Sequence, residues 1–313
     1  MFQFLPGPIA GVISFIFYIV NTIVLSIPLF IAAIAKFLIP LKVWRKHCDI
    51  VINGLASLWI SGNSFYHRFF QNVDFQVSGL ANLSRKNWYL VVSNHRSWTD
   101  IIILQKIFNG KIPFLKFFLK KELIYVPVIG LVWWALDFPF MKRYSKKYLE
   151  KHPHSKGKDF ETTRKACLKF KRIPISVMNF VEGTRFTPEK RARQTSPFAN
   201  LLKPKAGGIG YVMSVLGQQL SEVVNVTIVY PDEKHCSFWQ FLCGKVKKVR
   251  VHVETIPITD QIRCNDYVNN PKDRVKFQQW LNGLWEEKDK LISSMRDEWA
   301  QESRNNDQSQ AKA

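Results

Sequence analysis

The chain begins with an uncharged, strongly apolar segment. Its first charged residue is Lys36, and the stretch before it is rich in Ile, Phe, Val, Leu and Ala. About 20 consecutive apolar residues are enough to cross a bilayer, and this stretch is longer. It also exceeds the apolar core of a signal peptide and follows no basic segment, so we interpret residues 1–42 as a retained membrane anchor. Two arrangements stay open, a single crossing and an entry that returns near Pro28, and a buried core helix is the alternative to both.

Basic residues follow the apolar segment directly. They are Lys36, Lys42, Arg45 and Lys46. Positively charged residues beside a spanning segment stay on the cytoplasmic side of a membrane. We therefore expect the rest of the chain to face the cytoplasm. Residues 43–72 show a weaker helical pattern, which predicts a helix that lies on the membrane surface or caps the core.

From residue 73 onward, strand-like and helix-like patterns alternate. Runs rich in β-branched and aromatic residues predict strands over 74–79, 88–94, 111–118, 136–142, 175–182, 223–230 and 249–255. Apolar residues at helical spacing predict helices over 97–108, 159–172 and 277–299. This alternation favours an α/β domain over 73–300, with a mixed, largely parallel sheet flanked by helices. The polar residues 301–313 predict a disordered tail.

The charge of the chain restricts its partners more than its fold. The net charge of +21 suits nucleic acid, anionic lipid headgroups or an acidic substrate. No nucleic-acid-binding pattern is present, and the apolar N-terminal segment favours a membrane, so we expect no nucleic-acid partner. The five cysteines are scattered and form no CxxC pair, which predicts a reducing compartment and neither a disulfide framework nor a metal site.

One candidate catalytic pair follows the predicted strand 88–94. His95 lies in the turn after this strand, and Asp100 lies in the first turn of the helix predicted next, with Ser97 or Thr99 as its N-cap. Helical side chains lean toward the helix N-terminus, so Asp100 leans toward His95. A carboxylate on one imidazole nitrogen leaves the other nitrogen free as a general base. His154 has the same spacing to an aspartate but lies in a polar basic loop, and we interpret it as solvated surface.

A second candidate motif, Glu182-Gly183-Thr184-Arg185, ends the predicted strand 175–182. Glycine after a buried strand allows a sharp turn and brings the backbone close to a ligand. The planar guanidinium of Arg185 suits a phosphate. From the residues alone, a structural ion pair between Glu182 and Arg185 is an equal alternative.

Together these motifs resemble those of the PlsC-type glycerolipid acyltransferases. NHRSWTD resembles the first motif of that family and FVEGTR the third, and the resemblance covers about residues 75–230. KKELIYVPVIG followed by FMKR resembles the second motif, with matches at Lys121, Glu122, Pro127, Gly130 and Arg143. Two positions depart from the usual pattern, Lys142 before that arginine and Asn225 in place of a fourth-motif proline. Both departures resemble a branch that includes bacterial YihG-like proteins and eukaryotic endomembrane enzymes.

The resemblance implies a fold, a reaction and roles for residues. It implies the glycerolipid acyltransferase fold, with His95 as the general base and Asp100 as the residue that orients it. Binding of the acceptor phosphate is implied for the EGTR motif and Arg143. The resemblance also implies 1-acyl-glycerol-3-phosphate as the acceptor, phosphatidic acid as the product, and acyl-CoA or acyl-carrier protein as the co-substrate. No further cofactor and no covalent acyl-enzyme are expected, since the chain has no G-x-S-x-G motif.

Several alternatives stay open at this point. The acceptor can be another lysophospholipid, and a different class of function is a non-catalytic basic membrane protein that binds anionic lipid. The intact set of His95, Asp100, Glu182 and Arg185 counts against the second alternative. The branch resemblance favours the bacterial inner membrane as the location.

Overall fold

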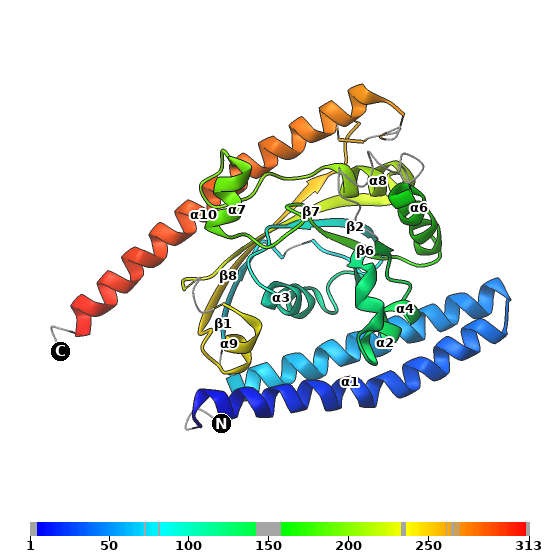
Figure 1. Ribbon diagram of the computed structural model, residues 1–313, viewed down its shortest axis with the longest axis horizontal. Coiled ribbons are helices and arrows are strands. Elements are labelled where there is room, and N and C mark those ends of the chain that lie inside the picture. Colours follow the sequence, from blue (N-terminus) through cyan, green and yellow to red (C-terminus); the bar gives the residue numbers. More distant parts are fainter. Residues whose placement is uncertain are drawn as a thin grey trace.

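A six-stranded mixed sheet lies at the centre of the protein (Figure 1). The computed structural model describes residues 5–71, 73–80, 82–141, 158–232, 236–260, 262–263, 267 and 269–310. In spatial order the strands are β1 (Asp74–Ser78), β8 (Lys248–Pro257), β7 (Leu220–Val229), β2 (Trp88–Ser93), β6 (Ser176–Phe180) and β3 (Leu115–Phe117). Only the pair β7 and β8 is antiparallel, and the other four neighbouring pairs are parallel. The predicted mixed, largely parallel sheet is confirmed.

Helices cover both faces of this sheet. Along β2, Leu90 and Val92 belong to one apolar core and Tyr89 and Val91 to the other, because successive strand residues point to opposite faces. The first core is closed by α6 (Lys158–Phe170), α8 (Gly207–Leu216) and α10 (Pro271–Gln310). The second core is closed by α3 (Thr99–Phe108), α4 (Ile129–Ala135) and α9 (Phe238–Leu242). Burial on both faces explains why β2 is a continuous apolar run instead of an alternating one.

The N-terminal segment forms two helices that lie side by side along the second face (Figure 1). They are α1 (Gly7–Leu38) and α2 (Lys42–Tyr66), and a π-helical turn, η1 (His67–Gln71), follows α2. Asn21 of α1 donates to the Asn63 side chain and to the Trp59 carbonyl of α2, at 2.8 and 3.0 Å. These elements occupy the segments predicted as anchor (1–42) and as interfacial or capping helix (43–72). Their role at a membrane stays a prediction.

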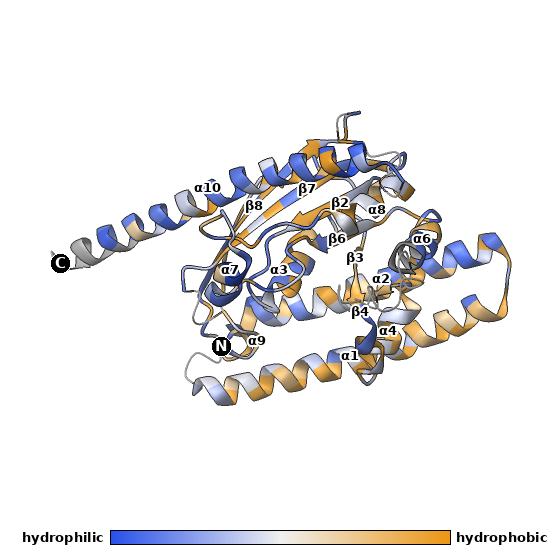
Figure 2. Cartoon of the chain, turned by 45° about the horizontal axis from the view of Figure 1, so that its top comes forward, coloured by the Kyte–Doolittle hydropathy of each residue, from blue (hydrophilic) through white to orange (hydrophobic). Residues whose placement is uncertain are grey.

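Helix α1 is long and apolar enough to cross a membrane by length and composition alone, and no other helix in the described part of the chain is. Buried core helices pass the same criterion, but only 11% of its most apolar window is buried. A core helix is therefore a poor description of α1, whose apolar colour contrasts with the polar outer half of α10 (Figure 2). The helix continues through Pro28, so the chain does not reverse there.

Three details differ from the sequence-based expectations. Residues 111–118 and 136–142 were expected as full strands, but they contribute only β3 and a two-residue pair, β4 (Leu119–Lys120) with β5 (Phe140–Met141). Pro113 and Pro139 lie in these segments, and proline has no N–H to donate to a neighbouring strand. The sequence pattern also gives no sign of η2 (Lys121–Tyr125), α4, α7 (Pro188–Gln194), α8 or α9.

The C-terminal helix is longer than its apolar face predicts. Residues 277–299 bury Phe277, Leu281 and Trp299, as expected. The tail expected to be disordered, 301–313, is instead helical as far as Gln310, and 311–313 lie outside the described residues. Arg250 of β8 forms ion pairs with Glu298 and Glu302, which are one turn apart on this helix.

Candidate active site

Parallel strands bring the two sequence motifs to the same edge of the sheet. Ser93 at the end of β2 is in register with Phe180 at the end of β6 and with Val226 of β7. His95 and Glu182 each lie two residues beyond the paired Ser93 and Phe180. The turns after the two strands therefore meet, as parallel register requires.

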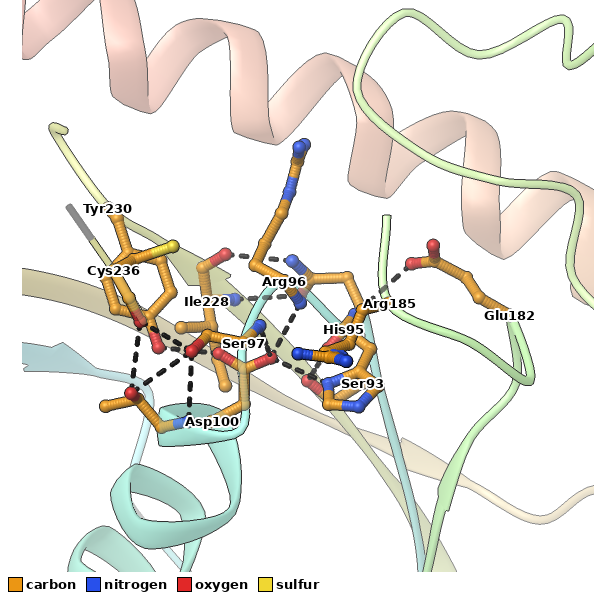
Figure 3. Close-up of polar contacts among 12 residues, drawn as sticks. Ser93, His95, Arg96, Ser97, Asp100, Glu182, Arg185, Ile228, Tyr230 and Cys236 are labelled. Atoms are coloured by element: carbon orange, nitrogen blue, oxygen red, sulfur yellow. Dashed lines mark hydrogen bonds and ion pairs between the residues drawn. The ribbon is translucent and has the colours of Figure 1, made fainter. Parts of the chain in front are cut away.

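The predicted His95–Asp100 pair is formed. The two side chains are joined by a hydrogen bond of 2.8 Å between Nδ1 and Oδ2, at the start of α3 (Figure 3). The same Oδ2 accepts the backbone N–H groups of Arg96 and Ser97, at 2.6 and 2.9 Å. Oδ1 accepts the hydroxyl of Tyr230 at 2.6 Å. Four donors thus hold one buried carboxylate, which is the arrangement expected for its ionised, acceptor-only form.

This geometry determines which nitrogen of His95 can act as a base. Because an ionised Asp100 has no proton to give, Nδ1 must carry the proton of their hydrogen bond. Nε2 is then the basic atom, and no described residue forms a hydrogen bond with it. The imidazole also stacks on the ring of Phe180, with centroids 3.9 Å apart. The ring is therefore held on one side by Asp100 and on one face by Phe180, while its side chain keeps 13% of its surface exposed.

The N-cap expected at Ser97 or Thr99 takes a different form. Trp98 occupies the cap position, and its side chain makes no capping hydrogen bond. Instead, the Asp100 carboxylate accepts the N–H of Ser97, and the Ser97 hydroxyl accepts the N–H of Thr99. A carboxylate in the first turn is also favoured by the helix dipole. Asp100 therefore stabilises the end of the helix that carries it.

Glu182 connects the two turns. Its side chain is fully buried, and its two oxygens accept the backbone N–H groups of His95 and Leu202, at 3.3 and 3.2 Å. Burial raises the pKa of Glu182 to about 8, against the lowering effect of those amides and of Arg96. Both oxygens are thus occupied by the protein itself. This geometry assigns Glu182 to positioning the turn of His95 and differs from the predicted phosphate contact.

The rest of the Glu182-Gly183-Thr184-Arg185 motif forms a cationic turn. Gly183 has a φ of +72°, which a residue with a Cβ adopts only with strain, and the Lys205 ammonium lies 3.4 Å from where that Cβ would be. Lys190 donates to the Thr184 hydroxyl and to the Arg185 carbonyl, both at 2.9 Å. Three cations, from Arg185, Lys190 and Lys205, therefore gather at one turn.

Arg185 itself is directed toward the first motif. Its guanidinium carbon lies 5.5 Å from the ring centre of Trp98, which is in the turn between His95 and Asp100. No ion pair joins Arg185 to Glu182 among the described residues, so the structural ion pair considered above is wrong. Arg143, together with Lys142 and His154, lies outside the described residues.

A model of the acyltransferase family, described as Acyltransferase, matches residues 74–230 of this chain, which is half of its length. The chain belongs to the acyltransferase family. The match contains both motifs and every residue of the dyad, and it agrees with the predicted PlsC-type membership. Assignment to the YihG-like branch stays a prediction.

The curated relatives of this acyltransferase chain include mammalian enzymes. It is 28% identical over 218 residues to 1-acyl-sn-glycerol-3-phosphate acyltransferase gamma of Homo sapiens, covering 66% of this chain and 53% of that protein. It is 26% identical over 212 residues to the delta enzyme of Mus musculus, covering 64% and 51%. The chain thus spans about half the length of the curated relatives it matches.

Among solved structures, the lysophosphatidic acid acyltransferase PlsC from Thermotoga maritima is similar in fold. The superposition has a TM-score of 0.48 at 17% identity and covers 88% of this chain and 95% of that one.

Several residues of this candidate site were not found from the sequence. Tyr230 and Asn94 are the clearest cases. Asn94 joins β2 to β7 by accepting the Ile228 N–H and donating to its carbonyl, at 2.9 and 2.8 Å. Tyr230 follows the end of β7, and Lys205 precedes α8, so both belong to turns at the same sheet edge. The signal available in the sequence was their position directly next to an apolar element.

The second motif of the resemblance is only partly described. Lys121 and Glu122 begin η2 with exposed side chains, and Gly130 is buried in α4. A Cβ at Gly130 would lie 2.3 Å from the Ile124 carbonyl oxygen, so a larger residue cannot fit without moving the backbone. Cys167 is fully buried, as expected for a core cysteine.

Proposed function

We propose that this protein transfers a fatty acyl group from a thioester to the free hydroxyl of 1-acyl-glycerol-3-phosphate, which gives phosphatidic acid. One observation carries the proposal. Nδ1 of His95 is bound to the buried Asp100, and Nε2, beside the cationic turn of Arg185, has no hydrogen-bond partner in the described part of the chain. A base and a phosphate-binding group are the two features that a phosphorylated alcohol needs in order to react. The names of the curated relatives support the same acceptor.

The proposed reaction needs no protein nucleophile. Nε2 of His95 removes the proton of the acceptor hydroxyl as its oxygen attacks the thioester carbonyl. The Asp100 carboxylate stabilises the imidazolium that forms, as the aspartate of a Ser-His-Asp triad does. When the tetrahedral intermediate collapses, the carbon–sulfur bond breaks, and the imidazolium returns the proton to the departing thiolate. The products are the acylated glycerol phosphate and the free thiol of CoA or of acyl-carrier protein.

The cationic turn supplies the proposed phosphate site. Arg185 offers two parallel N–H donors, and the ammonium groups of Lys190 and Lys205 lie against the same backbone turn. Arg143 is retained as a further predicted phosphate ligand. We assign Gly183 the role of letting the backbone turn closely beneath the phosphate.

The helix pair supports a location at a membrane surface. Near its start, α1 is held by a Ser14 hydroxyl that donates to the Leu242 carbonyl of α9 at 3.0 Å. Near its end, the Lys36 ammonium lies 2.6 Å from Asp137, which precedes β5. Because both ends are attached to the same domain, a crossing of the bilayer by α1 alone would separate these contacts. We infer that α1 lies along the cytoplasmic face with its apolar side chains inserted in one leaflet. These exposed side chains include Ile9, Ile16, Val20, Val24, Ile27, Ile31 and Ile34.

This placement suits the proposed acceptor. A lysophospholipid in a bilayer has its hydroxyl at the headgroup level, and extracting it costs about 0.8 kcal/mol per CH₂ group exposed to water. A domain attached to the interface by α1 avoids most of that cost. The bacterial inner membrane stays a prediction from the resemblance.

A lysolipid panel tests the proposal. Purified full-length protein would be offered labelled acyl-CoA or acyl-carrier protein, with lysophosphatidate, lysophosphatidylcholine, lysophosphatidylethanolamine and lysophosphatidylglycerol as acceptors. Mass spectrometry of the lipid products would show phosphatidic acid as the main product. If the protein acylated another lysophospholipid faster, that lysophospholipid would be the acceptor instead of 1-acyl-glycerol-3-phosphate. Binding of anionic lipid without acylation of any acceptor would favour the non-catalytic alternative.

A further inference from the structure

A charged cavity lies at the turn between α1 and α2, at the end of the helix pair that is far from the N-terminus (Figure 1). Its volume is about 210 Å³, several times the space that one water needs. The lining residues come from α1, α2, α4 and the end of α6; they are Ala33, Lys36, Phe37, Arg45, Trp134, Ala135, Asp137, Lys169 and Arg172. None of them belongs to the candidate active site.

Two carboxylates organise most of the charge around this cavity. The Lys36 ammonium lies 2.6 Å from both Asp49 and Asp137. Lys169 adds a second cation to Asp137 at 2.9 Å, and Arg172 adds a second cation to Asp49 at 3.5 Å. These pairs already place three positive charges against two negative ones.

Arg45 makes the imbalance larger. It is the fourth cation that lines the cavity, its side chain is half-buried, and its guanidinium forms no hydrogen bond or ion pair with any described residue. The cluster therefore has a net charge of +2, obtained from four cations and two carboxylates. Cations held close together in a partly desolvated cavity repel one another, and an anion that enters relieves this repulsion. A phosphate group suits the planar donors of Arg45 and Arg172.

The rim of the cavity shows what kind of anion it suits. Phe37 and Trp134 line it and are both more than half exposed. Exposed apolar side chains continue from it along the turn, at Leu38, Leu41 and Val43. A soluble anion would leave these apolar side chains exposed to water, whereas an amphiphile would cover them with its acyl chains.

We propose that this cavity binds the phosphate of an anionic diacyl phospholipid from the bilayer. The phosphate lies between Arg45, Lys169 and Arg172, and the acyl chains lie against Phe37 and the apolar turn. Such a site fixes the depth and rotation of the helix pair at the interface, which the apolar face of α1 alone does not determine. The proposal rests on the membrane placement of α1 and is independent of the reaction at His95.

A binding titration in neutral detergent tests the proposal without the general attraction of a charged bilayer. Full-length protein would be titrated with dioctanoyl phosphatidylglycerol, and isothermal titration calorimetry would report binding. We expect Arg45→Gln and Lys169→Gln each to weaken binding by about tenfold, as the loss of one charge-assisted contact predicts. Arg45 has no partner within the described chain to lose, so its replacement should leave the thermal midpoint unchanged.

Matched controls separate this site from the others. Lys46→Gln removes an exposed charge one residue from Arg45 and should leave the affinity unchanged. Arg185→Gln removes a charge of the candidate active site, and it should also leave the affinity unchanged if the lipid binds in the cavity. Dioctanoyl phosphatidylcholine, which has no net charge, should bind at least tenfold more weakly. Equal affinities of the Arg45→Gln, Lys46→Gln and original proteins would overturn the site. If inorganic phosphate bound as tightly and its binding also depended on Arg45, the cavity would be a site for soluble anions, and the proposal of a bound lipid would be wrong. Loss of binding in Arg185→Gln alone would assign the lipid to the active site.

Discussion

The turns after β2 and β6 each present a fully buried carboxylate near His95, but the two carboxylates are used differently. Asp100 accepts from an imidazole, a phenol and two backbone amides at 2.6–2.9 Å. Glu182 accepts only two backbone amides, at 3.2 and 3.3 Å, and burial raises its pKa to about 8. The number and strength of the donors separate the carboxylate that holds the proposed base from the one that joins two turns. Burial alone does not identify a catalytic acid or base.

The largest expected effect comes from Asp100→Asn. We expect kcat to fall by about 10²–10⁴, because a neutral amide no longer stabilises the imidazolium that forms when Nε2 takes the proton. The fold should persist, since the amide oxygen can still accept from Arg96 and Ser97 while its NH₂ faces the Tyr230 hydroxyl. Steady-state kinetics and thermal unfolding of the same preparation check both statements. A variant that keeps more than a tenth of the original kcat would give Asp100 a structural role like that of Glu182.

Arg185→Ala should have the next largest effect, and mainly on the acceptor. Loss of a charge-assisted phosphate contact costs about 1.5–3 kcal/mol, or roughly 10- to 150-fold in kcat/KM for the acceptor. The KM for the acyl donor should change little. Arg193→Ala, an exposed arginine of α7, is the matched control. If both variants showed the same acceptor kinetics as the original protein, the phosphate site would lie elsewhere.

Tyr230→Phe should have a smaller effect on turnover than on stability. It removes one of four donors to Asp100 and leaves a buried lone pair unsatisfied, at a cost of about 1.5–3 kcal/mol in the free energy of unfolding. The remaining three donors still hold the carboxylate, so we expect kcat to fall by less than about tenfold. A fall in kcat as large as that of Asp100→Asn would show that Tyr230 takes part in proton transfer itself.

Glu182→Gln should sharpen the comparison through pH. A folded pKa of about 8, above the unfolded value, means that the original protein loses stability as the pH rises from about 5 to 8. The slope from this one group is at most about 1.4 kcal/mol per pH unit. Glutamine cannot ionise, so the thermal midpoint of the Glu182→Gln protein should depend less on pH over this range. Parallel pH curves for the two proteins would mean that Glu182 does not titrate between pH 5 and 8.

The fold and the contact between His95 and Asp100 could be predicted from the sequence because their signals are local. An apolar run such as β2 is long enough to identify a strand, and His95 and Asp100 lie within one turn of each other. The register of β2 and β6, which brings Glu182 to the N–H of His95, depends on pairing between distant segments and leaves no local pattern. For this reason, the sequence selected Glu182 but not its contact.

The helix pair shows the same limit. Composition identified α1 as an unusual apolar helix, yet its arrangement depends on a few polar contacts, such as those of Ser14 and Lys36 with the domain. In the sequence, polar residues within an apolar segment only interrupt the hydrophobic pattern. In the structure, they are the attachment points that decide how the helix lies.

The central claim is that His95, and not the other histidine with the same spacing to an aspartate, is the base for acyl transfer. The most direct measurement compares acyl transfer from labelled acyl-CoA to lysophosphatidate by the original protein, His95→Ala and His154→Ala, in the same detergent and with the folded fraction of each confirmed. We predict that His95→Ala lowers kcat by about 10²–10⁴ and that His154→Ala leaves it within about twofold. A His95→Ala protein with nearly the original rate, free of contaminating enzyme, would contradict the account.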